Sequence, residues 1–306
     1  MTTSHLTVSV PNESMRRRLA PVDGAGFAVW DMVGTPPAGI TMAVVPYMSP
    51  VSTLRAIAGT GISIVQSQSI GYDGVADVLP AGTTFCNAAG VHEASTAELA
   101  VALTLASLRG IPEFALAQAE RRWAHDRFEA LADKRVLVIG QGGVGRAAAM
   151  RFRPFEVELV RVASTARTDE HGAVHAVSEL AALLPEVDVV LLAVPLTPAT
   201  TRLVDDDFLG AMKRGSLLVN VSRGAVVDTH ALVAHARDGR VRAALDVTDP
   251  EPLPADHPLW TTPGILITPH VGGDSTAMAP RVDRLIREQA ARLVRGDEPL
   301  NVVLRA

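Results

Sequence analysis

The sequence predicts an α/β protein of two domains, and three observations lead to this prediction. The chain has 306 residues, which suits two domains of about 100–200 residues each. Short apolar runs alternate with helical segments along both halves, a pattern typical of parallel sheets covered by helices on both faces. Between the halves, residues 94–109 form one long helical pattern that interrupts this alternation.

The individual elements follow from hydrophobic runs and helical periodicity. In the first half, strands are expected at residues 6–10, 27–32, 40–47 and 62–68, with helices at 15–21 and 52–60. In the second half, strands are expected at residues 135–140, 158–163, 187–194, 217–221, 243–247 and 265–268. The helices there are expected at 143–152, 180–184, 206–213 and 229–238, with an amphipathic helical tail at 278–294.

Two domains are expected to share these elements. Because the helical tail lies beyond the last strand, we assign residues 276–306 to the first domain together with residues 1–95. The second domain then comprises residues 96–275, in which the polar segment 110–132 is an excursion.

Composition excludes several classes of partner. Charged residues make up 20% and hydrophobic residues 48% of the chain, a balance typical of packed domains. The net charge is −5 and no basic block is present, so we expect no nucleic-acid partner. No stretch approaches the roughly 20 apolar residues that span a membrane. The N-terminal residues lack a signal-peptide core, and a single cysteine, Cys86, fits a reducing compartment. We therefore expect a cytoplasmic protein without a membrane partner.

A glycine-rich turn predicts a dinucleotide site. Gly140, Gly142 and Gly145 fit the pattern G-x-G-x-x-G directly after a predicted strand and at the start of a predicted helix. Glycines permit the tight turn and let backbone N–H groups approach a pyrophosphate, to which the helix N-terminus adds partial positive charge. The second domain is therefore predicted to be a Rossmann domain. The structural alternative is a glycine turn that only lets helix and strand pack closely.

The residues after the next strand predict the cofactor. An acidic residue would be expected near Ala163, but Ser164, Thr165 and Arg167 are found there instead. A carboxylate would hold a ribose 2′-hydroxyl, whereas hydroxyls and an arginine suit a 2′-phosphate. This favours NADP(H), with NAD(H) as the second cofactor that the site could take. The competing interpretation is that Arg167 points to solvent and the two hydroxyls simply bind a ribose.

Three loops that follow strands of the second domain carry an arginine, a carboxylate and a histidine, namely Arg223, Glu251 and His270. The carboxyl ends of parallel strands meet at one edge of a sheet, so these side chains should converge. Arginine binds a carboxylate and polarises a carbonyl, histidine donates a proton to the developing alkoxide, and a neighbouring carboxylate orients the ring. The set predicts an oxidoreductase that interconverts a 2-oxo acid and a 2-hydroxy acid, with His270 as general acid and base. No metal site is predicted.

These motifs resemble those of the D-isomer-specific 2-hydroxyacid dehydrogenases, which include phosphoglycerate dehydrogenase and glyoxylate/hydroxypyruvate reductases. The resemblance covers nearly the whole chain and rests on VLVIGQGGVG, residues 191–232, ALDVTDPEPLPADHPLW and ILITPHVGG, in that order. It implies a Rossmann domain, a flavodoxin-like substrate domain built from both chain ends, and a cleft between them. It also implies a D-2-hydroxy acid and a homodimer joined through residues 110–132. The alternative is a non-enzymatic dinucleotide sensor or a corepressor-like binding protein, because the family fold serves those roles too.

The resemblance also assigns residues to roles. The residues with catalytic roles are Arg223, Glu251 and His270. The residues that contact the substrate are Ser69, Ile70 and Gly71, whose loop binds the substrate carboxylate through backbone N–H groups, and Arg223 and His270. Asp246 would hold the nicotinamide carboxamide. The other residues expected around the dinucleotide are Gly143, Val144, Val194, Pro195, Val221, Ser222, Arg223, His270, Gly272 and Gly273.

Overall fold

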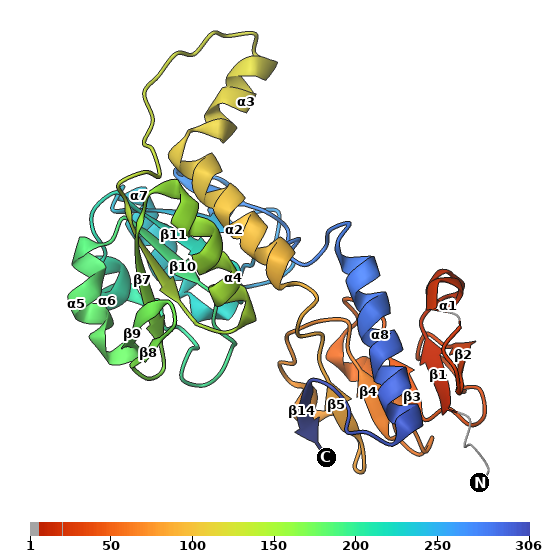
Figure 1. The fold of residues 1–306 in the computed structure, drawn as a ribbon. Coiled ribbons are helices and arrows are strands. Elements are labelled where there is room, and N and C mark those ends of the chain that lie inside the picture. Colours follow the sequence, from red (N-terminus) through yellow and green to blue (C-terminus); the bar gives the residue numbers. More distant parts are fainter. Residues whose placement is uncertain (1–5, 20) are drawn as a thin grey trace. The chain divides into compact units, whose positions relative to one another are not determined.

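The computed structural model of the protein describes residues 6–19 and 21–306. The chain divides into two compact units (Figure 1). Unit 1 contains the described residues up to His92 together with Thr276–Ala306, and unit 2 contains Glu93–Ser275. The boundaries therefore lie after residues 92 and 275, against the expected positions after residues 95 and 275.

Unit 1 is built on a six-stranded sheet in the order β14-β5-β4-β3-β1-β2. Its strands are β1 (Leu6–Val10), β2 (Ala25–Val29), β3 (Met42–Val44), β4 (Ile64–Gln66), β5 (Thr84–Cys86) and β14 (Val302–Arg305). The first five strands run parallel, and β14 pairs with β5 in the antiparallel sense. The order 2-1-3-4-5 of the parallel strands is that of flavodoxin-like sheets, as predicted.

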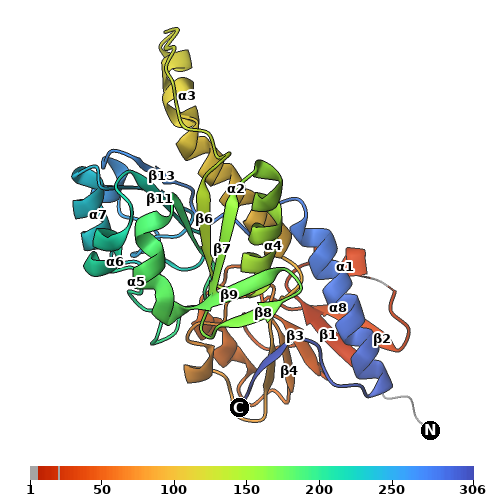
Figure 2. The same cartoon turned by 60° about the vertical axis from the view of Figure 1, so that its left-hand side comes forward.

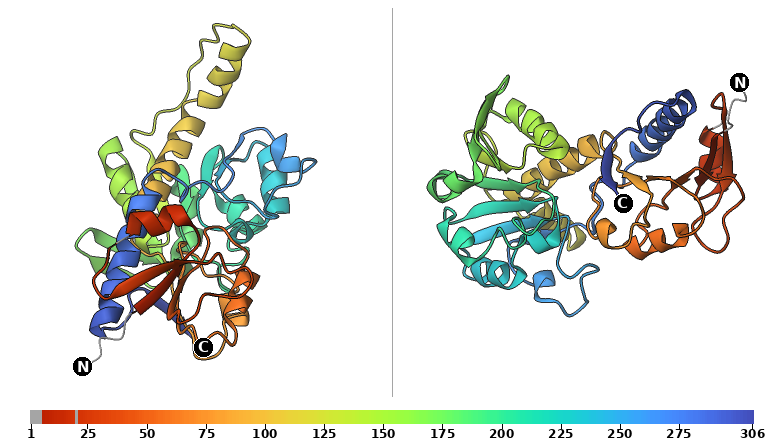
Figure 3. Two further views of the ribbon diagram at one scale, coloured as in Figure 1. Left: turned by 90° about the vertical axis from the view of Figure 1, so that its right-hand side faces the viewer. Right: turned by 90° about the horizontal axis from the view of Figure 1, so that it is seen from below.

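Helices cover both faces of this sheet. The α-helices α1 (Glu13–Leu19) and α8 (Met278–Arg295) lie on one face, where α8 packs against α1, β1 and β2 (Figure 3). The 3₁₀ helices η1 (Val51–Ile57) and η2 (Val75–Asp77) contribute to the apolar cluster of the other face. The helix predicted over residues 52–60 is thus a 3₁₀ helix over Val51–Ile57. Its β-branched residues disfavour an α-helix, and Gly59 ends the segment early. Ala20, within the helix predicted over residues 15–21, lies outside the described residues.

Unit 2 contains an eight-stranded sheet in the order β13-β12-β11-β10-β6-β7-β9-β8. Its strands are β6 (Arg135–Ile139), β7 (Glu158–Ala163), β8 (Arg167–Asp169), β9 (Gly172–Ala176), β10 (Val189–Leu192), β11 (Ser216–Asn220), β12 (Val241–Leu245) and β13 (Ile265–Ile267). All run parallel except β8, which pairs with β9 as an antiparallel hairpin at the edge. The chain reverses its direction across the sheet between β6 and β10. Loops at such a switch point form the ligand site of open α/β sheets.

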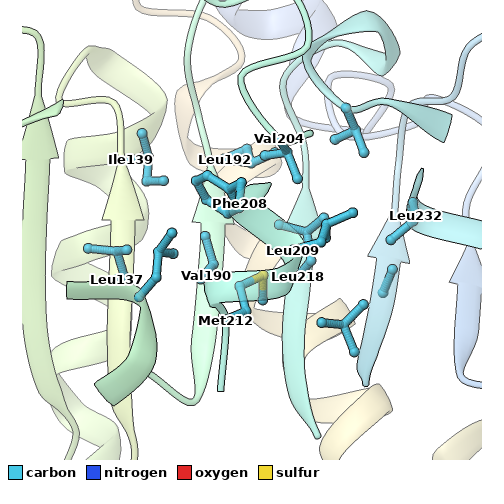
Figure 4. Packing of buried hydrophobic residues seen from close by; sticks show 14 of the residues in the cluster. Leu137, Ile139, Val190, Leu192, Val204, Phe208, Leu209, Met212, Leu218 and Leu232 are labelled. Carbon is cyan, nitrogen blue, oxygen red and sulfur yellow. The ribbon is translucent and has the colours of Figure 1, made fainter. Parts of the chain in front are cut away.

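Helices also cover both faces of the unit 2 sheet (Figure 2). The α-helices are α2 (Glu93–Leu108), α3 (Ile111–Ala119), α4 (Gly143–Phe152), α5 (Leu180–Leu183), α6 (Asp206–Ala211) and α7 (Thr229–Arg237). The 3₁₀ helices are η3 (Arg153–Phe155), η4 (Val177–Glu179), η5 (Leu184–Glu186), η6 (Gly224–Val226) and η7 (Pro258–Trp260). On one face, Phe208, Leu209 and Met212 from and beside α6 pack on the apolar side chains of β6, β10 and β11 (Figure 4). This packing makes the sheet a rigid base for the loops at its edge.

Helix α3 and the extended segment after it project from the rest of unit 2 (Figures 1 and 2). They correspond to the excursion expected at residues 110–132. Among the described residues, no single helix is both long and apolar enough to cross a membrane. Only α2 and α3 taken together reach that length and composition, and they meet at a bend of 67°.

Candidate active site

The glycine turn lies at the switch point of the unit 2 sheet. Gly140 has a φ of +101°, and a Cβ there would collide with the carbonyl oxygen of Ala193 in the loop after β10. A Cβ at Gly145 would collide with the carbonyl oxygen of Gly140. At Gly142, the N-cap of α4, a Cβ would meet nothing within 4 Å. The turn is thus packed tightly against backbone atoms at Gly140 and Gly145 and is open at Gly142. This shape fits a dinucleotide pyrophosphate at the N-terminus of α4.

The segment after β7 differs from the loop that the sequence predicted. Ser164 and Thr165 are exposed in a short connection, whereas Arg167 begins strand β8 of the hairpin. The hairpin is attached to β7 through Arg161, which donates to both carboxylate oxygens of Asp169 at 2.9 and 2.8 Å. The Arg161 side chain is 5% exposed. Its hydrogen bonds lower the pKa of Asp169 to about 2.

The loop that carries Arg223 is braced by the last residue of β11. The buried side chain of Asn220 donates from Nδ2 to the carbonyl oxygen of Arg223 at 2.9 Å. Its Oδ1 accepts from the backbone N of Ser222 at 3.0 Å and from Ser222 Oγ at 2.7 Å. A Cβ at Gly224 would collide with the backbone of Thr248. The Arg223 loop therefore has a defined shape and packs directly against the loop that carries Glu251.

A second buried side chain, Asp246, holds the loop that carries His270. Asp246 is 2% exposed. Its Oδ1 accepts from Thr268 Oγ1 at 2.6 Å and from the backbone N of Val271 at 2.9 Å. Its Oδ2 accepts from the backbone N of Gly272 at 2.9 Å. Asp246 is thus the organiser of this loop, a role that the sequence did not indicate.

His270 has an unusual backbone conformation and a carboxylate partner. Its φ is +54°, in the left-handed region that non-glycine residues rarely adopt and that recurs at functional sites. Its Nδ1 hydrogen-bonds Glu251 Oε1, and the two side chains are 30% and 36% exposed. Because Nδ1 is engaged by the carboxylate, Nε2 is the nitrogen through which His270 can exchange a proton with a bound molecule.

The predicted substrate loop of unit 1 follows β4. The backbone N of Ser69 donates to Ser67 Oγ at 2.9 Å, and Asn87 Nδ2 donates to the carbonyl oxygen of Ile70 at 2.8 Å. In the described part of the chain, the backbone N–H groups of Ile70 and Gly71 make no hydrogen bond. We expected the backbone N–H groups of Ser69, Ile70 and Gly71 to bind a carboxylate. Since the N–H of Ser69 already donates within the loop, only those of Ile70 and Gly71 are available for this role.

Apart from Arg167, which begins β8, the residues predicted around the dinucleotide and the catalytic set lie at or beside the strand ends of unit 2. A Cβ at Gly140 would lie 3.1 Å from Val194 Cγ1, which places the loop after β10 beside the turn. Val221, Ser222 and Arg223 follow β11, while Gly272 and Gly273 follow β13. Ser69, Ile70 and Gly71 belong to unit 1. Within residues 6–19 and 21–306, no group of three or more metal-ligating side chains is found.

Comparisons with known proteins agree with this geometry. Residues 101–272 match the model of the family described as D-isomer specific 2-hydroxyacid dehydrogenase, NAD binding domain. A glyoxylate reductase from Korarchaeum cryptofilum is 33% identical over 255 residues, which cover 79% of this chain and 76% of that protein.

Two solved structures extend the likeness to the whole chain. A D-isomer specific 2-hydroxyacid dehydrogenase from Xanthobacter autotrophicus, in complex with NADPH and MES, has a TM-score of 0.81 at 27% identity and covers 98% of both chains. An NADPH-dependent glyoxylate/hydroxypyruvate reductase from Sinorhizobium meliloti, in complex with NADP and malonate, has a TM-score of 0.81 at 26% identity. It covers 98% of this chain and 97% of that chain.

Proposed function

Because the chain belongs to the D-isomer specific 2-hydroxyacid dehydrogenase family, we propose that it reduces a small 2-oxo acid of the glyoxylate or hydroxypyruvate type with NADPH. It is an NAD(P)-dependent oxidoreductase that interconverts a 2-oxo acid and a D-2-hydroxy acid. The observation that carries the proposal is the hydrogen bond between His270 and Glu251, on a loop held by Asp246. The similarities are to enzymes, so the non-enzymatic alternative gains no support from them.

Three side chains divide the chemistry. When bound, the nicotinamide supplies a hydride to C2 of the oxo acid or takes one from the hydroxy acid. The guanidinium of Arg223 binds the substrate carboxylate and polarises the carbonyl. His270 donates the proton on Nε2 to the developing alkoxide oxygen and takes it back in the oxidative direction. Glu251 accepts from Nδ1–H, so it fixes the tautomer and stabilises the imidazolium. In unit 1, the N–H groups of Ile70 and Gly71 would serve as donors to a carboxylate.

The preference for NADPH rests on the end of β7. No carboxylate stands there to repel a 2′-phosphate, and Ser164, Thr165 and Arg167 offer hydroxyl and guanidinium donors. The similar structures from Xanthobacter autotrophicus and Sinorhizobium meliloti contain NADPH and NADP. NAD(H) remains the second cofactor that the site could accept.

A panel of 2-oxo acids tests the activity. The purified protein is mixed with NADPH or NADH and with glyoxylate, hydroxypyruvate or a larger 2-oxo acid, and the loss of reduced cofactor is followed by absorbance. Turnover of the two small acids, faster with NADPH, is the expected result. Tight binding of NADPH without turnover of any acid would contradict the activity and favour a dinucleotide sensor.

We also propose a cytoplasmic homodimer joined through residues 110–132. The apolar side chains of Ile111, Leu116 and Trp123 support this, because they are 54%, 67% and 95% exposed on the projecting segment. A second copy would remove this apolar surface from water. Light scattering should give twice the monomer mass for the wild type and the monomer mass for the double variant Leu116→Glu, Trp123→Ser. A wild-type monomer would overturn the dimer but leave the activity untouched.

A further inference from the structure

A carboxylate lies directly beside the glycine turn, and the proposed reaction does not use it. Glu93 is the first residue of α2, which packs along α4. A Cβ placed on Gly143, the first residue of α4, would lie 2.6 Å from Glu93 Cγ and 2.8 Å from Glu93 Oε1. The Glu93 side chain therefore fills the space above the start of α4 that a side chain at residue 143 would otherwise take.

The start of α4, where Glu93 lies, has a positive electrostatic potential. The first N–H groups of α4 carry the positive end of the helix dipole, and Gly142 leaves them approachable. A carboxylate near such an end is stabilised, as a phosphate is. Two negative groups that share the end repel each other, because unit charges a few ångströms apart interact strongly in a partly desolvated site. A pyrophosphate at the glycine turn would therefore be repelled by the Glu93 carboxylate beside Gly143.

We propose that Glu93 is a built-in competitor of the cofactor pyrophosphate, which weakens the binding of every pyrophosphate-containing ligand and speeds its release. The inference rests on the proposed function, because it places a dinucleotide at the glycine turn. It differs from the role proposed for Arg167 in its selectivity. Arg167 would act on the 2′-phosphate of NADPH alone, whereas Glu93 acts on the pyrophosphate that NADPH, NADH and ADP share.

The test measures binding rather than turnover. Glu93→Gln removes the charge and keeps the size of the side chain, Glu93→Asp keeps the charge, and Glu98→Gln removes a charge from the exposed side of the same helix. Calorimetric titrations use NADPH, NADH, ADP and adenosine 2′-monophosphate. We expect Glu93→Gln to bind NADPH, NADH and ADP roughly three- to thirty-fold more tightly than the wild type. Adenosine 2′-monophosphate, which lacks a pyrophosphate, should bind wild type and variant alike.

The outcomes separate this inference from the proposed function. Glu93→Asp and Glu98→Gln should both bind ADP as the wild type does, and rapid-mixing experiments should show slower release of NADPH from Glu93→Gln. If Glu93→Gln binds ADP no more tightly while the wild type binds NADPH, the inference is overturned and the proposed function stands. A wild type that binds neither NADPH nor ADP would overturn both. Thermal unfolding checks that Glu93→Gln is folded before its titrations are compared.

Discussion

The two sides of the switch point in unit 2 are built differently. On the side of β11 to β13, the buried side chains of Asn220 and Asp246 make several hydrogen bonds each to the loops that carry Arg223 and His270. On the side of β7, the exposed side chains of Ser164, Thr165 and Arg167 make no hydrogen bond within the described part of the chain. Under the proposed mechanism, proton transfer would rely on groups positioned before the substrate arrives. Selection between the two cofactors would rely on groups that the ligand itself must order.

The largest expected effect is a loss of kcat from a substitution on the side of β11 to β13. His270→Gln should lower kcat by about 100–10,000-fold, because it removes the proposed proton donor. The Kd for NADPH, measured by titration, should stay near that of the wild type because the glycine turn is unaltered. A kcat close to the wild-type value would remove His270 from its proposed role.

The next largest effect is expected at Asp246, which holds the His270 loop through hydrogen bonds. Asp246→Ala leaves the backbone N–H groups of Val271 and Gly272 without their acceptor, which should lower the free energy of unfolding by about 2–4 kcal/mol. It should also lower kcat by about 10–100-fold, because a small misplacement of a catalytic group can cost about this much. Denaturant unfolding and steady-state kinetics measure the two effects. The matched control is Asp249→Ala on the neighbouring loop, where the side chain is exposed. Equal stability of the two variants would mean that Asp246 does not hold the loop.

A smaller and more selective effect, on cofactor affinity, is expected on the side of β7. Arg167→Ala should raise the Kd for NADPH by roughly 10- to 150-fold and leave that for NADH almost unchanged, because a charge-assisted hydrogen bond contributes about 1.5–3 kcal/mol. Comparing kcat/KM for the two cofactors in wild type and variant measures it. A wild type that uses both cofactors equally would favour the other interpretation, in which Arg167 points to solvent.

The smallest effect concerns the attachment of the β8–β9 hairpin. Asp169 has a pKa of about 2 in the folded protein against its usual 3.8, so its pairing with Arg161 stabilises the fold fully above about pH 4. That contribution is lost as the pH falls from 3.8 through about 2. Asp169→Asn should therefore lower the Tm at pH 7 by about 2–4 °C. The difference from the wild type should shrink as the pH approaches 2. A difference in Tm that stays constant with pH would argue against the ion pair as its cause.

The sequence predicted regular elements better than the contacts between them. Helix α4 and strand β7 were predicted to the residue, because the glycine turn marks the helix start and apolar runs mark the sheet. The β8–β9 hairpin was not predicted, since its strands are short and polar and it is fastened by Arg161 from a different strand.

The candidate site shows the same division. The placement of Arg223, Glu251 and His270 at one sheet edge could be predicted, because each follows a strand whose end must face that edge. The roles of Asn220 and Asp246 could not, because they depend on which backbone N–H groups the loops turn towards them. Likewise, the approach of Glu93 to Gly143 depends on how α2 packs along α4, and no residue spacing encodes it.

The projecting segment carries an optical reporter. Of the three tryptophans, Trp30 is buried in unit 1 and Trp260 is 50% exposed, whereas Trp123 is 95% exposed. Indole emission shifts to shorter wavelength when water is removed from around the ring, so Trp123 reports on whatever covers the segment. In a dilution series, its fluorescence would follow the proposed dimerisation without a label, while the emission of the buried Trp30 stays constant. Because Trp123 is exposed, collisional quenchers can also reach its ring. The extent of quenching gives a second signal from the intact protein.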